Sequence, residues 1–210
     1  MLVKHMMTAS PICVGPDQTI SEVLDLMSNH DIHRLPVVDN GKLVGLVTQG
    51  VVAENSPSHL TTLSIHEMNY LLSKTKVKDI MIKKVVTISP DALIEEAADT
   101  MEVKDIGCLP VTAKDSTLLG IITTGDILSA FVKFFGYHEA GTRVVLDISE
   151  NKVGVISELG KVFADAKINV SHFLISSMSD NEFIIRVDDP DKKKVEKLLE
   201  SKGFTVVSVR

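Results

Sequence analysis

The chain of 210 residues is long enough for one large domain or for two to three small ones. Hydrophobic residues make up 44% and charged residues 24%, and a net charge of −6 without a basic face excludes nucleic acid as an expected partner. No run of about 18 apolar residues would span a membrane, and Lys4 and His5 interrupt any signal-peptide core, so we expect a cytoplasmic protein. Cys13 and Cys108 stand alone and indicate no disulfide framework.

A tandem repeat occupies the first two thirds of the chain. Residues 3–38 are matched by residues 77–112 at an offset of 74, and after one inserted residue 45–50 is matched by 120–125. Two such units tend to pack about a pseudo-twofold axis, with a natural ligand cleft at their seam. The positions at which the two copies differ therefore become candidates for function.

Each copy reads as strand, helix, strand, strand, helix. In the first copy a short strand at 12–14 precedes a helix that Thr19 and Glu22 open as a capping box, and Asp39-Asn40-Gly41 predicts a hairpin. The predicted buried stripes are Ile20, Val23, Leu24 and Met27 in the first copy and Ile94, Ala97, Ala98 and Met101 in the second. The closing helix, from about 126 to 135, is predicted to bury Ile127, Leu128, Phe131 and Phe134 or Phe135.

The pattern changes after residue 141. Strands at 142–149, 170–177, 181–187 and 204–209 alternate with a helix at 153–166 and one that Asp189 is predicted to cap, which gives the ferredoxin-like order βαββαβ. The predicted class is therefore α/β (α+β). The predicted boundaries are 1–60 for the first repeat, 61–76 for a helical linker, 77–136 for the second repeat, 137–141 for a linker and 142–210 for the last domain.

The sharpest local motif is Gly120-Ile-Ile-Thr123-Thr-Gly-Asp126, in which a buried strand runs into a helix N-terminus. Unpaired backbone N–H groups and the positive end of the helix dipole favour phosphate there. A carboxylate in the first turn, here Asp126, can accept two hydrogen bonds from a ribose diol. A plain strand-to-helix turn capped by Thr123 or Thr124 is the alternative, and the heptapeptide alone does not decide between the two.

Two copies of this motif, each after a Leu-Pro-Val strand, resemble a pair of cystathionine-β-synthase (CBS) motifs over residues 1–136. The resemblance implies adenine nucleotide or S-adenosylmethionine bound in clefts between the copies. The ribose would lie against the strand-to-helix end of one copy, and the adenine and phosphates against the other copy, with a guanidinium suited to phosphate. The implied residues of this first cleft are Thr123, Asp126, Ile12, Cys13, Val14, His33, Arg34, Leu35 and Pro36.

The mirror cleft differs at both polar positions. Val51 stands in the place of Asp126, and Gly107-Cys108 in the place of His33-Arg34. Each unsatisfied bond to a buried diol or phosphate costs about 1–3 kcal/mol. We therefore predict one nucleotide site in the pair, with the mirror cleft empty or binding something less polar. The residues of this degenerate cleft are Thr48, Val51, Val86, Thr87, Ile88, Gly107, Cys108, Leu109 and Pro110.

The C-terminal part, about 140–210, resembles an ACT domain through Asn151-Lys-Val-Gly154, Ile168-Asn169-Val170 and Gly203-Phe204. The resemblance implies side-by-side pairing of two copies, or amino-acid sensing. Asn151 and Val153 replace the acid and the proline of the family's usual loop, which favours pairing. A ligand of this domain would lie near Asn151, Gly154 and Asn169.

The order CBS, CBS, ACT resembles the AcuB-type acetoin-utilisation proteins of bacteria. The resemblance implies a homodimeric regulator that senses AMP, ADP, ATP or S-adenosylmethionine and acts on an unidentified protein, with acetoin or butanediol catabolism as the pathway. Neither a catalytic constellation nor metal-ligand spacing is evident, so no enzyme activity, cofactor or protein-bound metal is expected, and Mg²⁺ only beside a phosphate. The alternatives are an ACT-led amino-acid sensor with the CBS pair as scaffold, a structural dimeric adaptor, and an enzyme acting on nucleotide or a small hydroxyketone.

Overall fold

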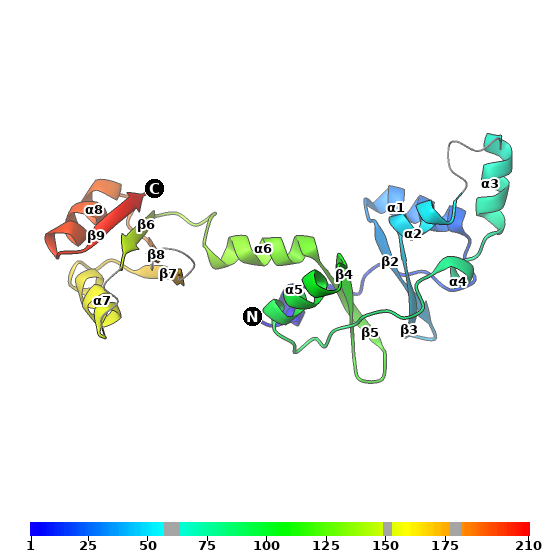
Figure 1. The fold of residues 1–210 in the computed structure, drawn as a ribbon, viewed down its shortest axis with the longest axis horizontal. Helices are drawn as coiled ribbons and strands as arrows, with labels where there is room; N and C mark the ends of the chain where they lie inside the picture. Colours follow the sequence, from blue (N-terminus) through cyan, green and yellow to red (C-terminus); the bar gives the residue numbers. More distant parts are fainter. Residues whose placement is uncertain (57–63, 149–152, 177–181) are drawn as a thin grey trace. The chain divides into compact units, whose positions relative to one another are not determined.

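The computed structural model describes residues 1–56, 64–148, 153–176 and 182–210 (Figure 1). The chain divides into two compact units, Met1–Leu128 and Ser129–Arg210. The first unit holds the two repeats as far as the start of α6 (Thr124–Phe134), and the second holds the rest of that helix and the helices and strands of the predicted ferredoxin-like fold. The predicted mixed α/β class is confirmed in both units.

The first repeat forms the predicted helix and hairpin. Its elements are α1 (Ile20–His30), β2 (Arg34–Asp39), β3 (Lys42–Thr48) and α2 (Gln49–Glu54), with β2 and β3 antiparallel. The Thr19 hydroxyl accepts a hydrogen bond from the Glu22 amide, and the Glu22 carboxylate accepts one from the Thr19 amide, so the predicted capping box opens α1. Ile20, Val23 and Met27 of the predicted stripe are buried in one core with β2 and β3.

The second repeat has the same architecture. Its elements are α5 (Ile94–Val103), β4 (Cys108–Thr112), β5 (Leu118–Thr123) and α6 (Thr124–Phe134), and α3 (Ile65–Lys74) and α4 (Val77–Ile80) precede them. Ile94, Ala97 and Met101 of its predicted stripe are buried. The hairpin β4–β5 is antiparallel like β2–β3, as the sequence repeat predicts.

The opening segment of each repeat packs against the other repeat. The Val3 amide in the 3-10 helix η1 (Val3–His5) donates to the Ala92 carbonyl at 2.9 Å, ahead of α5. The equivalent Val77 amide donates to the Gln18 carbonyl at 2.9 Å, ahead of α1. Figure 1 accordingly places the N-terminus beside α5. The two bonds differ by the offset of the repeat, so this exchange obeys the predicted pseudo-twofold symmetry.

The same exchange extends the two hairpins. The strand β1 (Thr8–Ala9) pairs with β5 of the second repeat. The residue equivalent to Thr8 is Ile82, and it exchanges two backbone hydrogen bonds, of 2.9 and 3.0 Å, with Leu46 in β3. Each hairpin is thus extended by the start of the other repeat, which binds the two copies into one unit.

The predicted strand at 12–14 is reduced to one bridge residue. The Val14 amide donates to the Pro36 carbonyl, and its carbonyl accepts from the Val38 amide, which makes a parallel bridge to β2. Gly15 and the turn after it end the pairing. Val14 is nevertheless 2% exposed, so the segment still contributes to the core.

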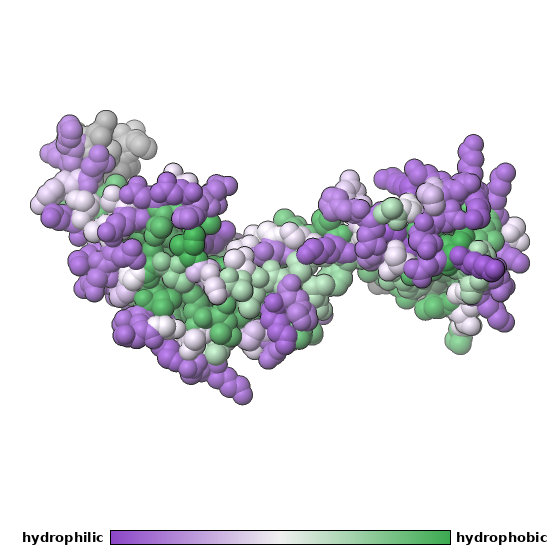
Figure 2. Space-filling model, turned by 180° about the vertical axis from the view of Figure 1, so that it is seen from behind, coloured by the Kyte–Doolittle hydropathy of each residue, from purple (hydrophilic) through white to green (hydrophobic). Residues whose placement is uncertain are grey.

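The predicted burial of the α6 stripe is wrong at Leu128 and Phe131, whereas Ile127 and Phe135 are half-buried. Leu128 is 66% exposed, Phe131 58% and Phe134 45%, and Ala130 is the buried residue of this helix. Hydrophobic atoms are accordingly visible along the helix in the space-filling view (Figure 2). The periodicity of α6 did identify an apolar face, but the described residues of this chain leave much of that face open to solvent.

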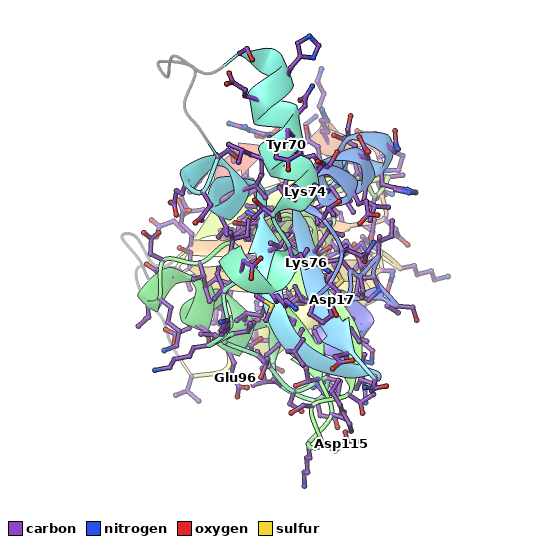
Figure 3. All side chains as sticks on the ribbon, turned by 90° about the vertical axis from the view of Figure 1, so that its right-hand side faces the viewer. Asp17, Tyr70, Lys74, Lys76, Glu96 and Asp115 are labelled. Carbon is purple, nitrogen blue, oxygen red and sulfur yellow. The ribbon has the colours of Figure 1, made fainter. Side chains whose placement is uncertain are left out.

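Ion pairs mark the pseudo-twofold exchange at the surface. Asp17 lies 2.8 Å from Lys78 Nζ and 3.6 Å from Lys76 Nζ, and Figure 3 shows Asp17 beside Lys76. The hydrogen bond from Lys78, its charge and that of Lys76 lower the pKa of Asp17. Lys4 and Asp91 form the equivalent pair at 2.7 Å. The side chains of these two equivalent ion pairs, Lys78–Asp17 and Lys4–Asp91, are largely exposed, so the contacts add little to stability.

A further contact joins the tips of the two hairpins. Lys42 donates to the carboxylate of Asp115, at the outer end of the β4–β5 hairpin (Figure 3), and to the Thr117 hydroxyl at 3.0 Å. The bond from Lys42, together with two from Thr117, lowers the pKa of Asp115 to about 2. Since Lys42 and Thr117 are themselves related by the repeat offset, the contact lies at the pseudo-twofold axis.

Lys42→Ala should raise the pKa of Asp115 toward its ordinary value of 3.8, while the Thr117 bonds keep it somewhat lower. Because the folded-state pKa is depressed, this carboxylate stabilises the fold above pH 3.8, and that contribution is lost as the pH falls toward 2. A carbon-detected NMR titration of the carboxyl groups measures the shift, with Asp91, which Lys4 holds, as the internal control. An unchanged Asp115 titration in the variant would contradict the assignment.

The second unit is a four-stranded antiparallel sheet of order β7-β8-β6-β9. Its elements are β6 (Thr142–Asp147), α7 (Val155–Asp165), β7 (Val170–Ser176), β8 (Glu182–Val187), α8 (Lys192–Ser201) and β9 (Thr205–Val209). The predicted order βαββαβ is confirmed. Leu159 and Phe163 of α7 and Leu199 of α8 share one core with the buried residues of β6 and β8.

Two details of this unit differ from the sequence expectations. Asp191, and not Asp189, is the N-cap of α8, since the Asp191 side chain accepts from the Lys194 amide at 3.1 Å. The predicted linker 137–141 is bound to the sheet, because Arg186 Nη1 donates to the Glu139 carbonyl at 2.8 Å and His172 Nδ1 lies 3.4 Å from the Glu139 carboxylate. This segment is therefore held by β7 and β8.

Candidate functional site

Among the cavities that the described residues line, two of about 310 Å³ or more lie between the two repeats of the first unit. The smaller one, of about 310 Å³, is lined by Thr8, Pro11, Ile12, Asp31, Ile32, His33, Arg34, Ile121 and Thr123. The larger one, of about 660 Å³, is lined by His33, Arg34, Leu46, Thr48, Gln49, Gly50, Ile82, Lys84, Val85, Val86, Asp105, Ile106, Gly107 and Cys108. Both volumes lie in the range of small-molecule pockets, roughly 300–1,000 Å³.

The two cavities are related by the repeat. Every residue that lines the smaller cavity has its counterpart in the larger one, from Thr8 with Ile82 to Thr123 with Thr48. They are therefore the two clefts that the pseudo-twofold symmetry predicts. The larger cavity adds Lys84, which replaces Ser10 of the first repeat.

The Arg34 side chain borders both cavities. A Cβ at Gly107 would collide with Arg34 Nη2, so the glycine leaves the space that the guanidinium occupies. Burial raises the pKa of the Cys108 thiol, and the neighbouring charge of Arg34 acts in the opposite direction. The sequence comparison placed His33 and Arg34 in the first cleft alone. The structure corrects this, because both residues also line the larger cavity.

Asp126 lies in the first turn of α6, beside the smaller cavity. Its Oδ2 accepts hydrogen bonds from the Thr123 amide at 2.7 Å and from the Thr123 hydroxyl at 2.9 Å. Asp126 thus caps α6 as Glu22 caps α1. At the mirror position Val51 replaces Asp126. There the Thr48 hydroxyl caps the helix instead, since it accepts a hydrogen bond from the Val51 amide at 3.2 Å. The sequence left open a turn capped by Thr123 or Thr124; the capping side chain is instead Asp126, to which the Thr123 hydroxyl donates, and this bond holds the carboxylate next to the cavity wall.

The residues predicted for the first cleft separate into lining and supporting residues. Ile12, His33, Arg34 and Thr123 line the smaller cavity. The others lie behind that wall or beside it: Val14 (2% exposed), Leu35 (0%), buried Pro36, half-buried Cys13 and the capping Asp126. The structure therefore brings four of the nine residues together around one space.

The degenerate cleft separates in the same way. Its lining residues are Thr48, Val86, Gly107 and Cys108. The remaining predicted residues are Val51, which packs on the first core, Thr87, which lines a different cavity of about 190 Å³, Ile88, which bridges to β4, and buried Leu109 and Pro110. This cleft is the larger of the two, and it contains cations that the sequence comparison did not place there.

Several lining residues were not predicted from the sequence. They are Thr8, Pro11, Asp31, Ile32 and Ile121 in the smaller cavity and Leu46, Gln49, Gly50, Ile82, Lys84, Val85, Asp105 and Ile106 in the larger. Lys84 had a detectable signal, because a lysine replaces Ser10 at the repeat offset. Thr8 and Ile82 had none, since their position follows from the exchange of opening segments.

The candidate ligand residues of the second unit are only partly described. Asn151 lies outside the described residues. Gly154 precedes α7 with a φ of +100°. Asn169 is exposed, and its amide donates to the Asp188 carboxylate at 3.0 Å, which ties the start of β7 to the end of β8. Amino-acid binding at these residues stays a prediction.

The described residues also bear on metal sites and on membrane-spanning helices. No group of three or more His, Cys, Asp or Glu side chains in the described ranges is arranged to hold a metal ion. None of the helices described is long and apolar enough to cross a membrane.

Two protein-family models match the chain. The CBS domain model matches residues 3–55 and 77–133, which together are just over half of the sequence. The ACT domain model matches residues 143–201. The first match covers both repeats with their clefts, and the second covers most of the C-terminal sheet.

Solved structures resemble the CBS part. A putative acetoin utilization protein (AcuB) from Vibrio cholerae is 31% identical, with a TM-score of 0.55 over 66% of this chain and 95% of its own. CBSX2, solved in complex with AMP, is 28% identical, with a TM-score of 0.52 over 63% of this chain and 96% of its own.

A third structure is the CBS domain pair of protein MJ0100, solved in complex with 5′-methylthioadenosine and S-adenosyl-L-methionine. It is 29% identical, with a TM-score of 0.52 over 62% of this chain and 99% of its own. The fold, the repeat and the family models agree: the chain belongs to the CBS domain family, with two tandem CBS domains followed by a C-terminal ACT domain.

Proposed function

We propose that this chain is a non-catalytic regulatory protein whose CBS pair binds an adenine nucleotide in the smaller cavity. One observation carries the proposal. Ile12, Arg34 and Thr123, which lie far apart in the sequence, line one space of about 310 Å³, with the Asp126 carboxylate beside it.

The chemistry of the wall suits the three parts of a nucleotide. Pro11, Ile12 and Ile121 offer apolar surface to a base. The Asp126 carboxylate can accept from a ribose diol while it still caps α6, because a carboxylate has about four acceptor positions. The Arg34 guanidinium presents a fork of donors that matches a phosphate.

The comparisons support the ligand class and are less specific about the pathway. CBSX2 was solved with AMP, and the MJ0100 pair with two adenosine compounds, so AMP and S-adenosylmethionine are the first ligands to test. The likeness to the Vibrio cholerae AcuB supports acetoin catabolism as the regulated pathway. We expect the protein to act in the cytoplasm.

The proposed output is a shift between two states of the protein. Asp126, which would contact the ribose, lies in the first turn of α6, and α6 leads along the chain toward the ACT domain. A ligand shifts an equilibrium only through different affinities for the two states. Nucleotide binding that alters the cap of α6 would supply that difference.

The open apolar surfaces support a homodimer as the regulatory form. Leu128 and Phe131 of α6 are more than half exposed, and Ile175 on the sheet-edge strand β7 is 50% exposed. An edge strand with apolar side chains is a common surface for pairing with another chain. The two chains of the proposed dimer would pair through their CBS domains, their ACT domains or both.

The wild-type protein should be stabilised by AMP, ADP, ATP or S-adenosylmethionine, and Asp126→Ala should lose most of this effect. At a ligand concentration of 100 times Kd the expected stabilisation is about 2.7 kcal/mol, which raises the Tm by several degrees. Thermal melts with and without each ligand, followed by calorimetric titration, measure the affinity.

The matched control is Glu22→Ala. Glu22 caps α1 as Asp126 caps α6, so both variants lose a cap worth about 1 kcal/mol. Glu22 is bonded to Thr19, which lines neither cavity, whereas Asp126 is bonded to the cavity-lining Thr123, so the Glu22 variant should keep the full ligand-induced shift. Equal ligand shifts in wild type and Asp126→Ala would remove Asp126 from the site, and no shift with any adenine compound would overturn the proposed function.

A further inference from the structure

We propose that the larger cavity is a second site, specific for a phosphate-bearing anion without a ribose, and that its occupant competes with the bound nucleotide for Arg34. The proposal rests on the proposed function, since it assumes that a nucleotide occupies the smaller cavity. It replaces the expectation that the larger cleft is empty or binds a less polar ligand.

The larger cavity lacks the group that recognises a ribose. Val51 occupies the position of Asp126, and its side chain packs against the core of the first repeat. The Thr48 hydroxyl, the counterpart of Thr123, accepts from the Val51 amide at 3.2 Å. A ribose diol placed there would lose the charged acceptor that Asp126 offers on the other side.

The same cavity gains positive charge. Lys84 lines it in the place of Ser10, and Arg34 reaches it over Gly107. Each cavity has one equivalent aspartate in its wall, Asp105 in the larger and Asp31 in the smaller. These carboxylates therefore do not change the difference in charge between the two cavities. A lysine and a guanidinium around about 660 Å³ suit a compact polyanion with several phosphate oxygens.

Arg34 couples the two sites. It borders both cavities, and its repeat counterpart Cys108 supplies no second cation. Two phosphate groups that pair with this guanidinium share its donors and its single positive charge, and two anions that approach the same cation also repel each other. Occupation of the larger cavity should therefore weaken binding of a nucleotide phosphate in the smaller one, and the reverse must hold by linkage.

The test titrates the full chain with AMP, and separately with adenosine, in the presence of increasing inorganic pyrophosphate at constant ionic strength. The Kd for AMP should rise at least about 5-fold and then reach a plateau, as expected for coupling between two sites. The Kd for adenosine, which carries no phosphate, should stay constant. A Kd for AMP that rises in proportion to pyrophosphate without a plateau would show direct competition in one cavity and would overturn the proposal.

Two neighbouring lysines give matched variants. Lys84→Ala should raise the pyrophosphate concentration for half of the effect about 10-fold, since a charge-assisted contact is lost. Lys83→Ala, one residue away and outside both cavities, should leave it unchanged. Both side chains are exposed, so both variants should fold. Equal behaviour of the two variants would contradict an anion site at Lys84.

Arg34→Ala tests the sharing itself. Its AMP affinity should fall toward that of adenosine and become insensitive to pyrophosphate. Sensitivity equal to that of the wild type would overturn the role of Arg34. The outcomes separate the two proposals: failure of AMP, ADP, ATP and S-adenosylmethionine to bind refutes the proposed function, whereas AMP binding that pyrophosphate never alters refutes this inference alone.

Discussion

Leu35→Ala should lower the free energy of unfolding by about 2–5 kcal/mol, the range for emptying a buried leucine site. Leu35 is 0% exposed and belongs to the core of the first repeat, although its place in the sequence motif suggests a wall of the nucleotide cleft. The lost methyl groups leave a cavity between α1 and the β2–β3 hairpin that the surrounding side chains fill only in part. Urea denaturation followed by circular dichroism measures the change.

Ile12→Ala is the control for Leu35→Ala. Ile12 is 37% exposed and lines the smaller cavity, so its truncation should cost about 1 kcal/mol or less in stability. It should weaken AMP binding about 5-fold, because it removes apolar contact with the base. A loss of stability in Leu35→Ala as small as that in Ile12→Ala would contradict the place of Leu35 in the core.

Gly120→Ala should lower the free energy of unfolding by about 1–3 kcal/mol, the cost of overpacking. A Cβ at Gly120 would lie 2.6 Å from Met7 Sδ and 2.8 Å from the Thr8 carbonyl oxygen. Met7 can rotate away, but Thr8 is backbone and is held by the pairing of β1 with β5. The substitution should therefore loosen the exchanged N-terminal segment, and hydrogen exchange of the Ser10 amide, which donates to the Leu119 carbonyl, should increase.

Two other glycines serve as matched controls. Gly45→Ala, the repeat counterpart, collides mainly with the end of the flexible Met81 side chain, and the nearest backbone oxygen is 3.2 Å away, so it should cost less than Gly120→Ala. Gly160→Ala lies within α7 with nothing within 4 Å of the new Cβ, and it should stabilise the protein by about 0.5–1 kcal/mol. A larger loss at Gly45 than at Gly120 would contradict the role given to the Thr8 carbonyl.

The local elements were predictable because their signals are local. The capping box of α1, the Asn40-Gly41 turn and the period of the buried stripes each depend on residues within one or two helical turns. The apolar period of α6 misled for the same reason. Periodicity identifies an apolar face, but whether another element covers that face depends on contacts far along the chain.

The candidate site was predictable in part. Comparison of the copies identified Asp126 and Arg34, which Val51 and Cys108 replace in the other copy, and Thr123, which both copies share as threonine. The structure brings Thr123 and Arg34 to one cavity. Val14 and Leu35 were assigned to the same cleft by motif position, yet their side chains point into the core. Alternation along a strand places neighbours on opposite faces, so a motif of consecutive residues cannot all line one wall.

The sequence by itself determined the duplication, the two hairpins, the ferredoxin-like order of the last domain and the inequality of the two clefts, because each follows from residue identity at fixed spacing. Only the tertiary structure showed that each opening segment pairs with the other repeat, and that the Arg34 guanidinium lies at both cavities. Both depend on long-range contacts: Val3 finds Ala92, and Arg34 fills the space that Gly107 leaves. A long side chain reaches several ångströms from its Cα. Its position in the sequence therefore predicts where its backbone lies, but the packing of the opposite repeat determines which cavity its charged end borders.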